Sequence, residues 1–66
     1  MNIQINGENR EISPSQSLSG LIKKLYPRKQ RIAVLLNDDM IPVDKQIAHI
    51  LKEGDRVEIL TFAGGG

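Results

Sequence analysis

The sequence predicts a small α+β domain in which a mixed sheet wraps around one amphipathic helix. Three features support this prediction: an alternating hairpin pattern near the N-terminus, one helical stripe of apolar residues, and later apolar segments of strand length. The 66 residues are enough for one domain, which at this size buries roughly 60% of its unfolded surface and has little room for an internal active site. We therefore expect a protein that acts through its surface.

The first segment of the chain predicts a β-hairpin. Ile3 and Ile5 alternate with polar residues, and Asn6-Gly7 is a pair that a type I′ turn prefers. Residues 8–12 continue as the second strand of the hairpin.

The main helix is expected to follow Ser17, which is a suitable N-cap residue. The apolar stripe of this helix has the spacing i, i+3, i+4 and i+7 and consists of Leu18, Leu21, Ile22 and Leu25. The helix should end at Tyr26, because Pro27 disfavours the α conformation in the residue before it.

The second half of the chain predicts three more strands. Residues 32–36 are a continuous apolar run typical of a central strand, and residues 40–43 contain Pro42 and predict a short edge strand. Residues 56–61 form the last strand after a turn at residues 53–55.

A short helix or turn is expected between the last two strands, within residues 45–51, with Ile47, Ile50 and Leu51 packed inward. The complete order is hairpin, helix, strand, short strand, short helix and strand. This order fits the β-grasp architecture of ubiquitin-like proteins, with residues 1–62 as the folded domain and residues 63–66 as a flexible tail.

The tail ends in Gly64, Gly65 and Gly66, and this glycine run is the most informative feature of the chain. Without Cβ atoms the run is thin enough to enter a narrow active site on another protein. Extended, residues 63–66 reach about 13 Å beyond the last strand. We expect the Gly66 carboxylate to be the functional group, and the alternative is an inert end without a role.

Strand alternation predicts where a partner could dock. If Val57, Ile59 and Thr61 face the helix, Leu60 and Phe62 face outward, and the same alternation turns Leu35 outward. These outward residues define a predicted docking patch of Leu35, Leu60 and Phe62 beside the tail. The alternative is that Phe62 simply covers the edge of the sheet.

Composition excludes several functional classes. A formal net charge of +1 and a pI of about 8.1 give no strong field for nucleic acid or an anionic membrane. The chain has no cysteine, which excludes disulfides, thiolate zinc sites and cysteine nucleophiles. We expect a soluble cytoplasmic protein, because no apolar run approaches the roughly 20 residues of a membrane span and no apolar leader precedes residue 2.

Other conspicuous side chains favour structural interpretations. The basic residues Lys23, Lys24, Arg28, Lys29 and Arg31 are interpreted as a solvated surface. Asp38 and Asp39 lack the alternating ligand spacing of a calcium loop and are expected to form a turn. His49 has no cysteine or serine partner in a recognisable arrangement, so we expect a surface or half-buried position without a catalytic or metal role.

The whole chain resembles the ThiS family, the sulfur carrier proteins of thiamine thiazole biosynthesis. The residues that carry this resemblance are 3–7, 17–22, 34–37 with 41–42, 53–59 and the glycine end. The resemblance implies a protein cosubstrate that binds no cofactor and is not itself an enzyme. It implies that an E1-like adenylyltransferase of the ThiF type uses ATP and Mg to adenylate Gly66. It further implies that a sulfur donor, such as a cysteine desulfurase system, converts the adenylate to a thiocarboxylate, which a ThiG-type thiazole synthase consumes.

Two other classes of function remain open from the sequence. The chain could be a related carrier or modifier, either the small subunit of molybdopterin synthase or a ubiquitin-like protein joined to lysines through Gly66. It could also be a β-grasp binding module with an inert tail. A triple glycine rather than a double one leaves the role of Gly64 open.

Overall fold

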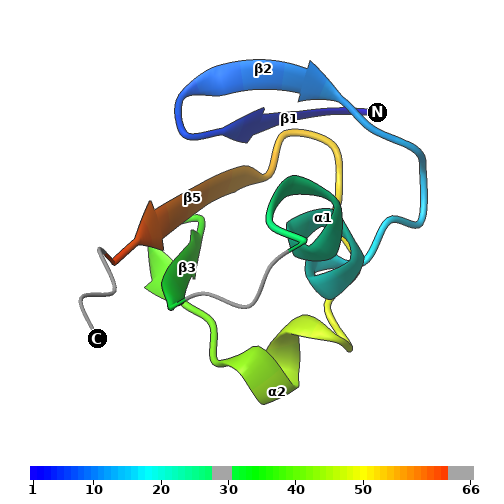
Figure 1. Ribbon diagram of the computed structural model, residues 1–66. Coiled ribbons are helices and arrows are strands. Elements are labelled where there is room, and N and C mark those ends of the chain that lie inside the picture. The colour runs from blue at the N-terminus through cyan, green and yellow to red at the C-terminus, as the bar shows by residue number, and fades with distance from the viewer. Residues whose placement is uncertain (28–30, 63–66) are drawn as a thin grey trace.

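The computed structural model describes residues 1–27 and 31–62 of the chain (Figure 1). Within these ranges the elements are β1 (Asn2–Ile5), β2 (Glu8–Glu11), α1 (Leu18–Leu25), β3 (Ile32–Leu36), β4 (Asp39–Met40), α2 (Val43–Gln46) and β5 (Arg56–Thr61). The strands form one sheet that curves around α1, as the sequence predicts (Figure 1). The two faces of the sheet therefore differ: an inner face covers α1, and an outer face is open to solvent.

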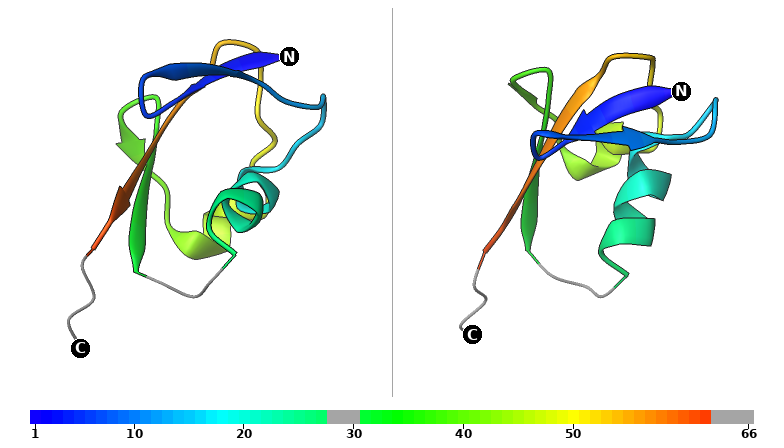
Figure 2. Two further views of the ribbon diagram at one scale, coloured as in Figure 1. Left: turned by 45° about the horizontal axis from the view of Figure 1, so that its top comes forward. Right: turned by 90° about the horizontal axis from the view of Figure 1, so that it is seen from above.

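The strands of this mixed sheet lie in the order β2-β1-β5-β3-β4. β1 is antiparallel to β2 and parallel to β5, while β3 is antiparallel to both β5 and β4. The start of β1 and the end of β5 consequently lie at opposite ends of the sheet (Figures 1 and 2).

Residues 32–36 form an interior strand, as predicted, with β5 on one side and β4 on the other, but the middle position of the sheet belongs to β5. The continuous apolar run of β3 arises because both faces of this strand carry apolar side chains. Val34 and Leu36 are buried on the inner face, whereas Ala33 and Leu35 lie half-buried on the outer face.

Two hairpin turns use residues that tolerate positive φ. Asn6 and Gly7 have φ of 50° and 83°, and Asn37 and Asp38 have φ of 51° and 73°. Positive φ at both central positions is the signature of the type I′ turn, whose twist matches that of the flanking strands. The predicted turn at Asn6-Gly7 and the predicted turn role of Asp38 are confirmed.

Helix α1 begins and ends as the sequence predicts. The Ser17 side chain accepts a hydrogen bond from the Gly20 N–H at 3.1 Å, and the helix ends at Leu25 before Tyr26 and Pro27. The apolar stripe of α1 packs against the inner face of the sheet. The buried core formed there consists of Ile3, Ile5, Leu18, Leu21, Ile22, Val34, Leu36, Leu51, Val57 and Ile59.

Thr61 departs from the expected inward pattern. It pairs with Ile32 at the end of the β3–β5 ladder, but its side chain is exposed. Side chains of β5 still alternate between the two faces at Thr61, but the core does not extend that far. Only Val57 and Ile59 of this strand are buried.

The segment after β4 differs most from the prediction. β4 covers only Asp39–Met40, and α2 starts at Val43 because Pro42 takes the N-cap position. Ile47 and Ile50 are exposed rather than packed inward, and only Leu51 of the three predicted core residues is buried. Gln46 turns inward instead, and its Nε2 donates to the Ile41 carbonyl at 3.0 Å.

Candidate functional site

The outer face of β3 and β5 carries most of the predicted docking patch. Leu60 lies opposite Ala33, and Leu35 lies opposite Met40 of β4 on the same face. The exposed fraction is 50% for Leu60 and 69% for Met40, while Leu35 is half-buried between its neighbours. Met40 extends this apolar surface. It was not among the predicted site residues, because the sequence of residues 40–43 predicts an edge strand but not which face of the sheet Met40 occupies.

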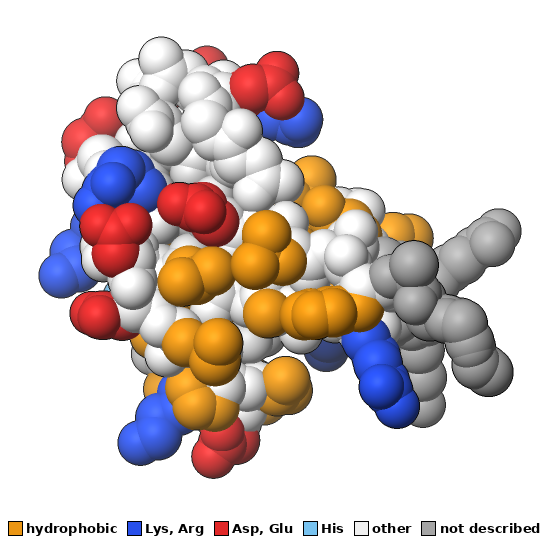
Figure 3. All heavy atoms as spheres, turned by 90° about the vertical axis from the view of Figure 1, so that its left-hand side faces the viewer, with side chains coloured by type: hydrophobic (Ala, Val, Ile, Leu, Met, Phe, Trp, Pro, Cys, Tyr) orange, Lys and Arg blue, Asp and Glu red, His pale blue; other side chains and the backbone are white. Residues whose placement is uncertain are grey.

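Side chains are not distributed evenly over this outer face. Figure 3 views the molecule from that side: polar and charged side chains cover the upper part, and the hydrophobic side chains gather in the middle and lower part, with charged side chains at the margins. The β5 ladder explains this division: Arg56 and Glu58 lie on the outer face near the start of the strand, and Leu60 follows near its end. The apolar part of the face thus lies at the end of β5.

Phe62 connects the outer face to a pocket beside α2. Its backbone N–H donates to the Arg31 carbonyl at 3.1 Å, and its side chain is 56% exposed. We call this pocket the tail-root pocket; it is a wide, open hollow of about 470 Å³ that is lined by Arg31, Ile32, Val43 and Phe62. Arg31 and Val43 were missed as site residues, because their proximity to Phe62 arises only from the tertiary fold.

The glycine residues of the predicted site, Gly64, Gly65 and Gly66, lie outside the described residues. The described chain ends one residue after β5, at Phe62. The tail of residues 63–66 therefore follows directly from the apolar end of the outer face.

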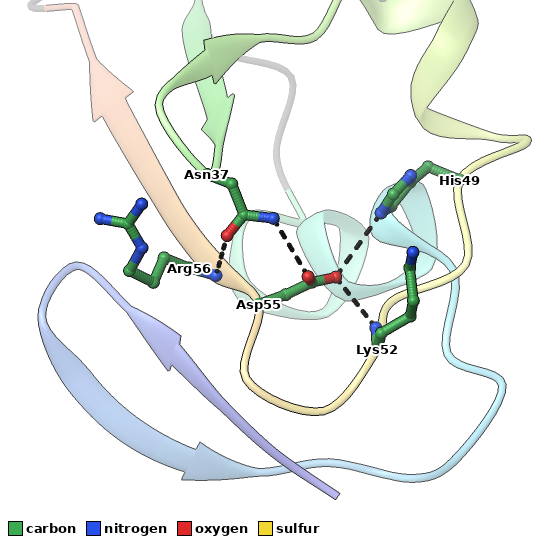
Figure 4. Close-up of polar contacts among 5 residues, drawn as sticks. All are labelled: Asn37, His49, Lys52, Asp55 and Arg56. Carbon is green, nitrogen blue, oxygen red and sulfur yellow. Dashed lines mark hydrogen bonds and ion pairs between the residues drawn. The ribbon is translucent and has the colours of Figure 1, made fainter.

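A second cluster of polar side chains lies at the other end of β5 (Figure 4). The carboxylate of Asp55 accepts hydrogen bonds from the Lys52 N–H at 2.9 Å and from Asn37 Nδ2 at 3.1 Å. Asn37 Oδ1 accepts from the Arg56 N–H at 2.9 Å, and His49 Nε2 lies 3.6 Å from Asp55 Oδ2, just beyond hydrogen-bond length. This cluster joins the β3–β4 turn to the loop before β5.

The protonation of Asp55 reflects these contacts. Burial acts to raise the pKa of the Asp55 carboxyl. The hydrogen bonds from the Lys52 N–H and Asn37, together with the nearby His49, outweigh burial, and the pKa lies below its ordinary value. His49 is half-buried, as predicted, and its pairing with Asp55 was not anticipated. The cluster contains no serine or cysteine to act as a nucleophile, and its contacts are those of a structural element.

The basic residues predicted to form a solvated surface are exposed where the structure describes them. Lys23 and Lys24 are exposed in the last turn of α1, and Arg31 is exposed; Arg28 and Lys29 lie outside the described ranges. Across residues 1–27 and 31–62, no group of three or more possible metal-ligating side chains comes together. In the same ranges, neither helix has the length and apolar character needed to cross a membrane.

Comparison with known proteins identifies the family. The model of the ThiS family matches residues 3–66 of this chain, which includes the whole sheet except its first residue, Asn2, and extends to the glycine end. The chain belongs to the ThiS family. This ThiS-family membership confirms the resemblance found from the sequence.

A solved ThiS-family structure supports the fold. The crystal structure of the thiamine biosynthesis protein ThiS from Geobacter metallireducens is 30% identical to this chain, with a TM-score of 0.83 and complete coverage of both chains. The mixed sheet around one helix is thus the β-grasp, ubiquitin-like fold that the sequence predicts.

Two curated relatives have names from the same area of metabolism. The sulfur carrier protein ThiS of Escherichia coli strain K12 is 24% identical over the full length of both chains. The thiazole synthase of Paramagnetospirillum magneticum strain AMB-1 is 33% identical over all 66 residues of this chain, which spans only 20% of that protein. The chain therefore corresponds to one part of the longer relative.

Proposed function

We propose that this ThiS-family protein is a sulfur carrier of thiamine biosynthesis that acts through Gly66. In this proposal an E1-like adenylyltransferase of the ThiF type uses ATP and Mg to adenylate the Gly66 carboxylate. A sulfur donor, supplied through a cysteine desulfurase, replaces AMP and leaves a thiocarboxylate. A ThiG-type thiazole synthase then takes the sulfur, so the carrier is a cosubstrate of its partners and not an enzyme.

The activation step has a simple chemical reason. A carboxylate is a poor electrophile, so an oxygen of Gly66 first attacks the α-phosphorus of ATP and releases pyrophosphate. The outer sulfur of a persulfide donor then attacks the carbonyl carbon and AMP leaves. A thiol reductant cleaves the resulting acyl disulfide to the thiocarboxylate, so one oxygen of the terminus is exchanged for sulfur. Adenylation and sulfur attack both require the terminus to be held in line with its reaction partner while water is excluded.

The observation that carries the proposal is the position of the exposed apolar surface. The docking patch lies at the end of β5, and the tail follows Phe62 immediately. Fixing four residues costs roughly 1–2 kcal/mol each, and glycine offers little side-chain contact to offset this cost. A partner that binds the tail therefore needs affinity from the folded domain, and Leu60 and Phe62 are placed to supply it.

Relatives support one of the proposed partners, the thiazole synthase. The E. coli relative is named as a sulfur carrier, and the P. magneticum relative is named as a thiazole synthase that contains a segment similar to this whole chain. A carrier-like segment within a thiazole synthase supports a functional partnership between the two. The adenylyltransferase and the sulfur donor are proposed from the chemistry of activation.

Intact-mass measurement tests the proposed function. The purified chain would be incubated with ATP, Mg, a ThiF-type adenylyltransferase, a desulfurase-based sulfur donor and a thiol reductant, and the terminus then sequenced by fragmentation. We expect a mass increase equal to the difference between sulfur and oxygen, localised to Gly66. An unmodified terminus would contradict the proposal, and conjugates between Gly66 and lysine side chains would indicate a protein modifier instead.

A further inference from the structure

The tail-root pocket lies where the docking patch meets α2. Ile32 of β3, Val43 of α2 and Phe62 after β5 supply its apolar lining. Phe62 belongs to both the docking patch and the pocket. A partner that covers the docking patch and receives the tail therefore reaches the pocket as well.

The apolar residues of this pocket are unusually accessible. Val43 is 72% exposed and Phe62 is 56% exposed. Phe62 is also the single phenylalanine of the chain. Exposed apolar side chains gathered around one hollow are typical of an interaction site, and aromatic side chains are enriched at the core of such sites.

Arg31 gives the pocket a charge preference. Its carbonyl holds the backbone of Phe62, so the residue is fixed beside the pocket that it lines. None of the acidic side chains in the described ranges forms an ion pair with it. Arg31 is exposed and lines the pocket, so a positively charged residue lies beside the apolar side chains, and a partner carboxylate next to an apolar group would complement both.

We propose that the tail-root pocket receives an apolar side chain of the activating enzyme, with an acidic side chain of that enzyme paired to Arg31. This inference rests on the proposed function, because the enzyme that adenylates Gly66 has to bind the tail, which begins directly after Phe62. It adds to the docking patch a second contact, on the α2 side of Phe62. The enzyme would then contact the domain on both sides of Phe62, at the docking patch and at the tail-root pocket.

Steady-state kinetics of pyrophosphate exchange with a purified ThiF-type adenylyltransferase test the proposal. Val43→Asp places a charge in the apolar lining, and Ile47→Asp is its matched control, since Ile47, the C-cap residue just after α2, is 69% exposed and is not among the residues that line the pocket. Arg31→Glu is matched by Arg10→Glu on β2, an exposed position with the same change in charge. Thermal unfolding of each variant checks that the exposed substitutions leave the fold intact.

We expect the KM for the carrier to rise about tenfold in Val43→Asp and in Arg31→Glu, and both controls to remain within about twofold of wild type. A wild-type KM in Val43→Asp would overturn the pocket as a contact, and so would an equal rise in Ile47→Asp. A wild-type KM in Arg31→Glu would overturn the acidic partner group. Absence of exchange with the wild-type carrier would instead contradict the proposed function itself, and the pocket proposal would fall with it.

Discussion

At the scale of single residues, two asparagine side chains extend the hydrogen bonding of β5 beyond its backbone ladders. Asn6 Oδ1 accepts from the Ile59 N–H at 2.8 Å, and Asn37 Oδ1 accepts from the Arg56 N–H at 2.9 Å. Both asparagines also occupy positive-φ positions in tight turns. Each residue therefore sets the conformation of its own turn and satisfies a donor on the central strand, which asparagine can do because it tolerates this region and has a side-chain amide.

The Asp55 carboxylate also accepts hydrogen bonds from neighbouring loops, and we predict that its contribution to the free energy of unfolding depends on pH. Its pKa is lower in the folded protein than the ordinary value, so the ionised group stabilises the fold above that value and the stabilisation is lost as the pH falls through the folded pKa. Asp55→Asn should therefore reduce the free energy of unfolding by about 1–3 kcal/mol near neutral pH, and by less at about pH 3.

Urea unfolding of wild type and variant at both pH values measures this difference. Asp44→Asn is a suitable control, because Asp44 is exposed on α2 and has no ion pair within the described chain. A deficit in Asp55→Asn that stays constant with pH would contradict the assigned role of the carboxylate.

At the scale of elements, α1 depends on its first turn. Ser17 is the N-cap, and a Cβ added at Gly20 would approach the Ser17 Oγ to 3.0 Å and the Gln16 Nε2 to 2.6 Å. The small size of residue 20 therefore leaves room for the cap. The buried apolar stripe of α1 begins at Leu18, the first helical residue, which is fully buried.

Loss of the cap has a predictable cost. Ser17→Ala leaves the Gly20 N–H without its acceptor, and we expect a decrease of about 1 kcal/mol in the free energy of unfolding. Chemical denaturation measures this decrease. Ser19→Ala, two residues further along and inside the helix, does not alter the N-cap and should change stability much less; an equal loss in both variants would argue against the cap.

The inner face of β5 contributes to the core, and its outer face carries part of the docking patch. Leu60→Asp changes only the outer face. Leu60 is half exposed on the outer face, so the substitution should leave the core intact. If the docking patch binds the activating enzyme, the KM for adenylation should rise about tenfold or more, because a charge is placed in an apolar contact. Met40→Asp is an informative companion, since Met40 lies on the same face but further from the end of β5.

An unchanged KM in Leu60→Asp would remove the docking patch from the proposed function. Substitution of the buried Ile59 by Asp would show what loss of folding looks like in the same assays.

At the scale of the whole molecule, folded domain and tail have separate tasks. The core lies between α1 and the inner face, while the exposed apolar residues lie on the outer face and around α2. The proposed chemistry takes place beyond both, at Gly66. Stability and transfer should therefore respond to different substitutions.

Bulky residues in the tail test this separation. Gly65→Trp and Gly66→Trp should abolish thiocarboxylate formation, because a narrow active site cannot admit the side chain, while the Tm stays near that of wild type. Mass spectrometry and thermal unfolding of the same samples give both values. A large fall in Tm would show that the tail stabilises the domain, and full transfer activity would contradict its entry into a narrow site. Gly64→Trp in the same series determines whether Gly64 is part of the site or a spacer.

Sequence reasoning predicted much of the fold, because the relevant signals are local. The Asn6-Gly7 turn, the Ser17 cap and the alternation around Val57 and Ile59 each depend on residues a few positions apart. It erred between residues 40 and 51, where short elements leave few residues for a periodic pattern. There the start of α2 after Pro42 and the inward turn of Gln46 decided which side chains are buried.

The ThiS-like β-grasp pattern and the glycine end can be read from the linear chain alone, since periodicity, turn residues and composition are properties of the sequence. The position of β5 at the centre of the sheet was decided only by the tertiary structure. So were the contact of Asp55 with Asn37 and His49 and the pocket that brings Arg31 and Val43 to Phe62. These features join residues far apart in the chain, and such contacts are fixed by how the sheet folds around α1 rather than by any local preference.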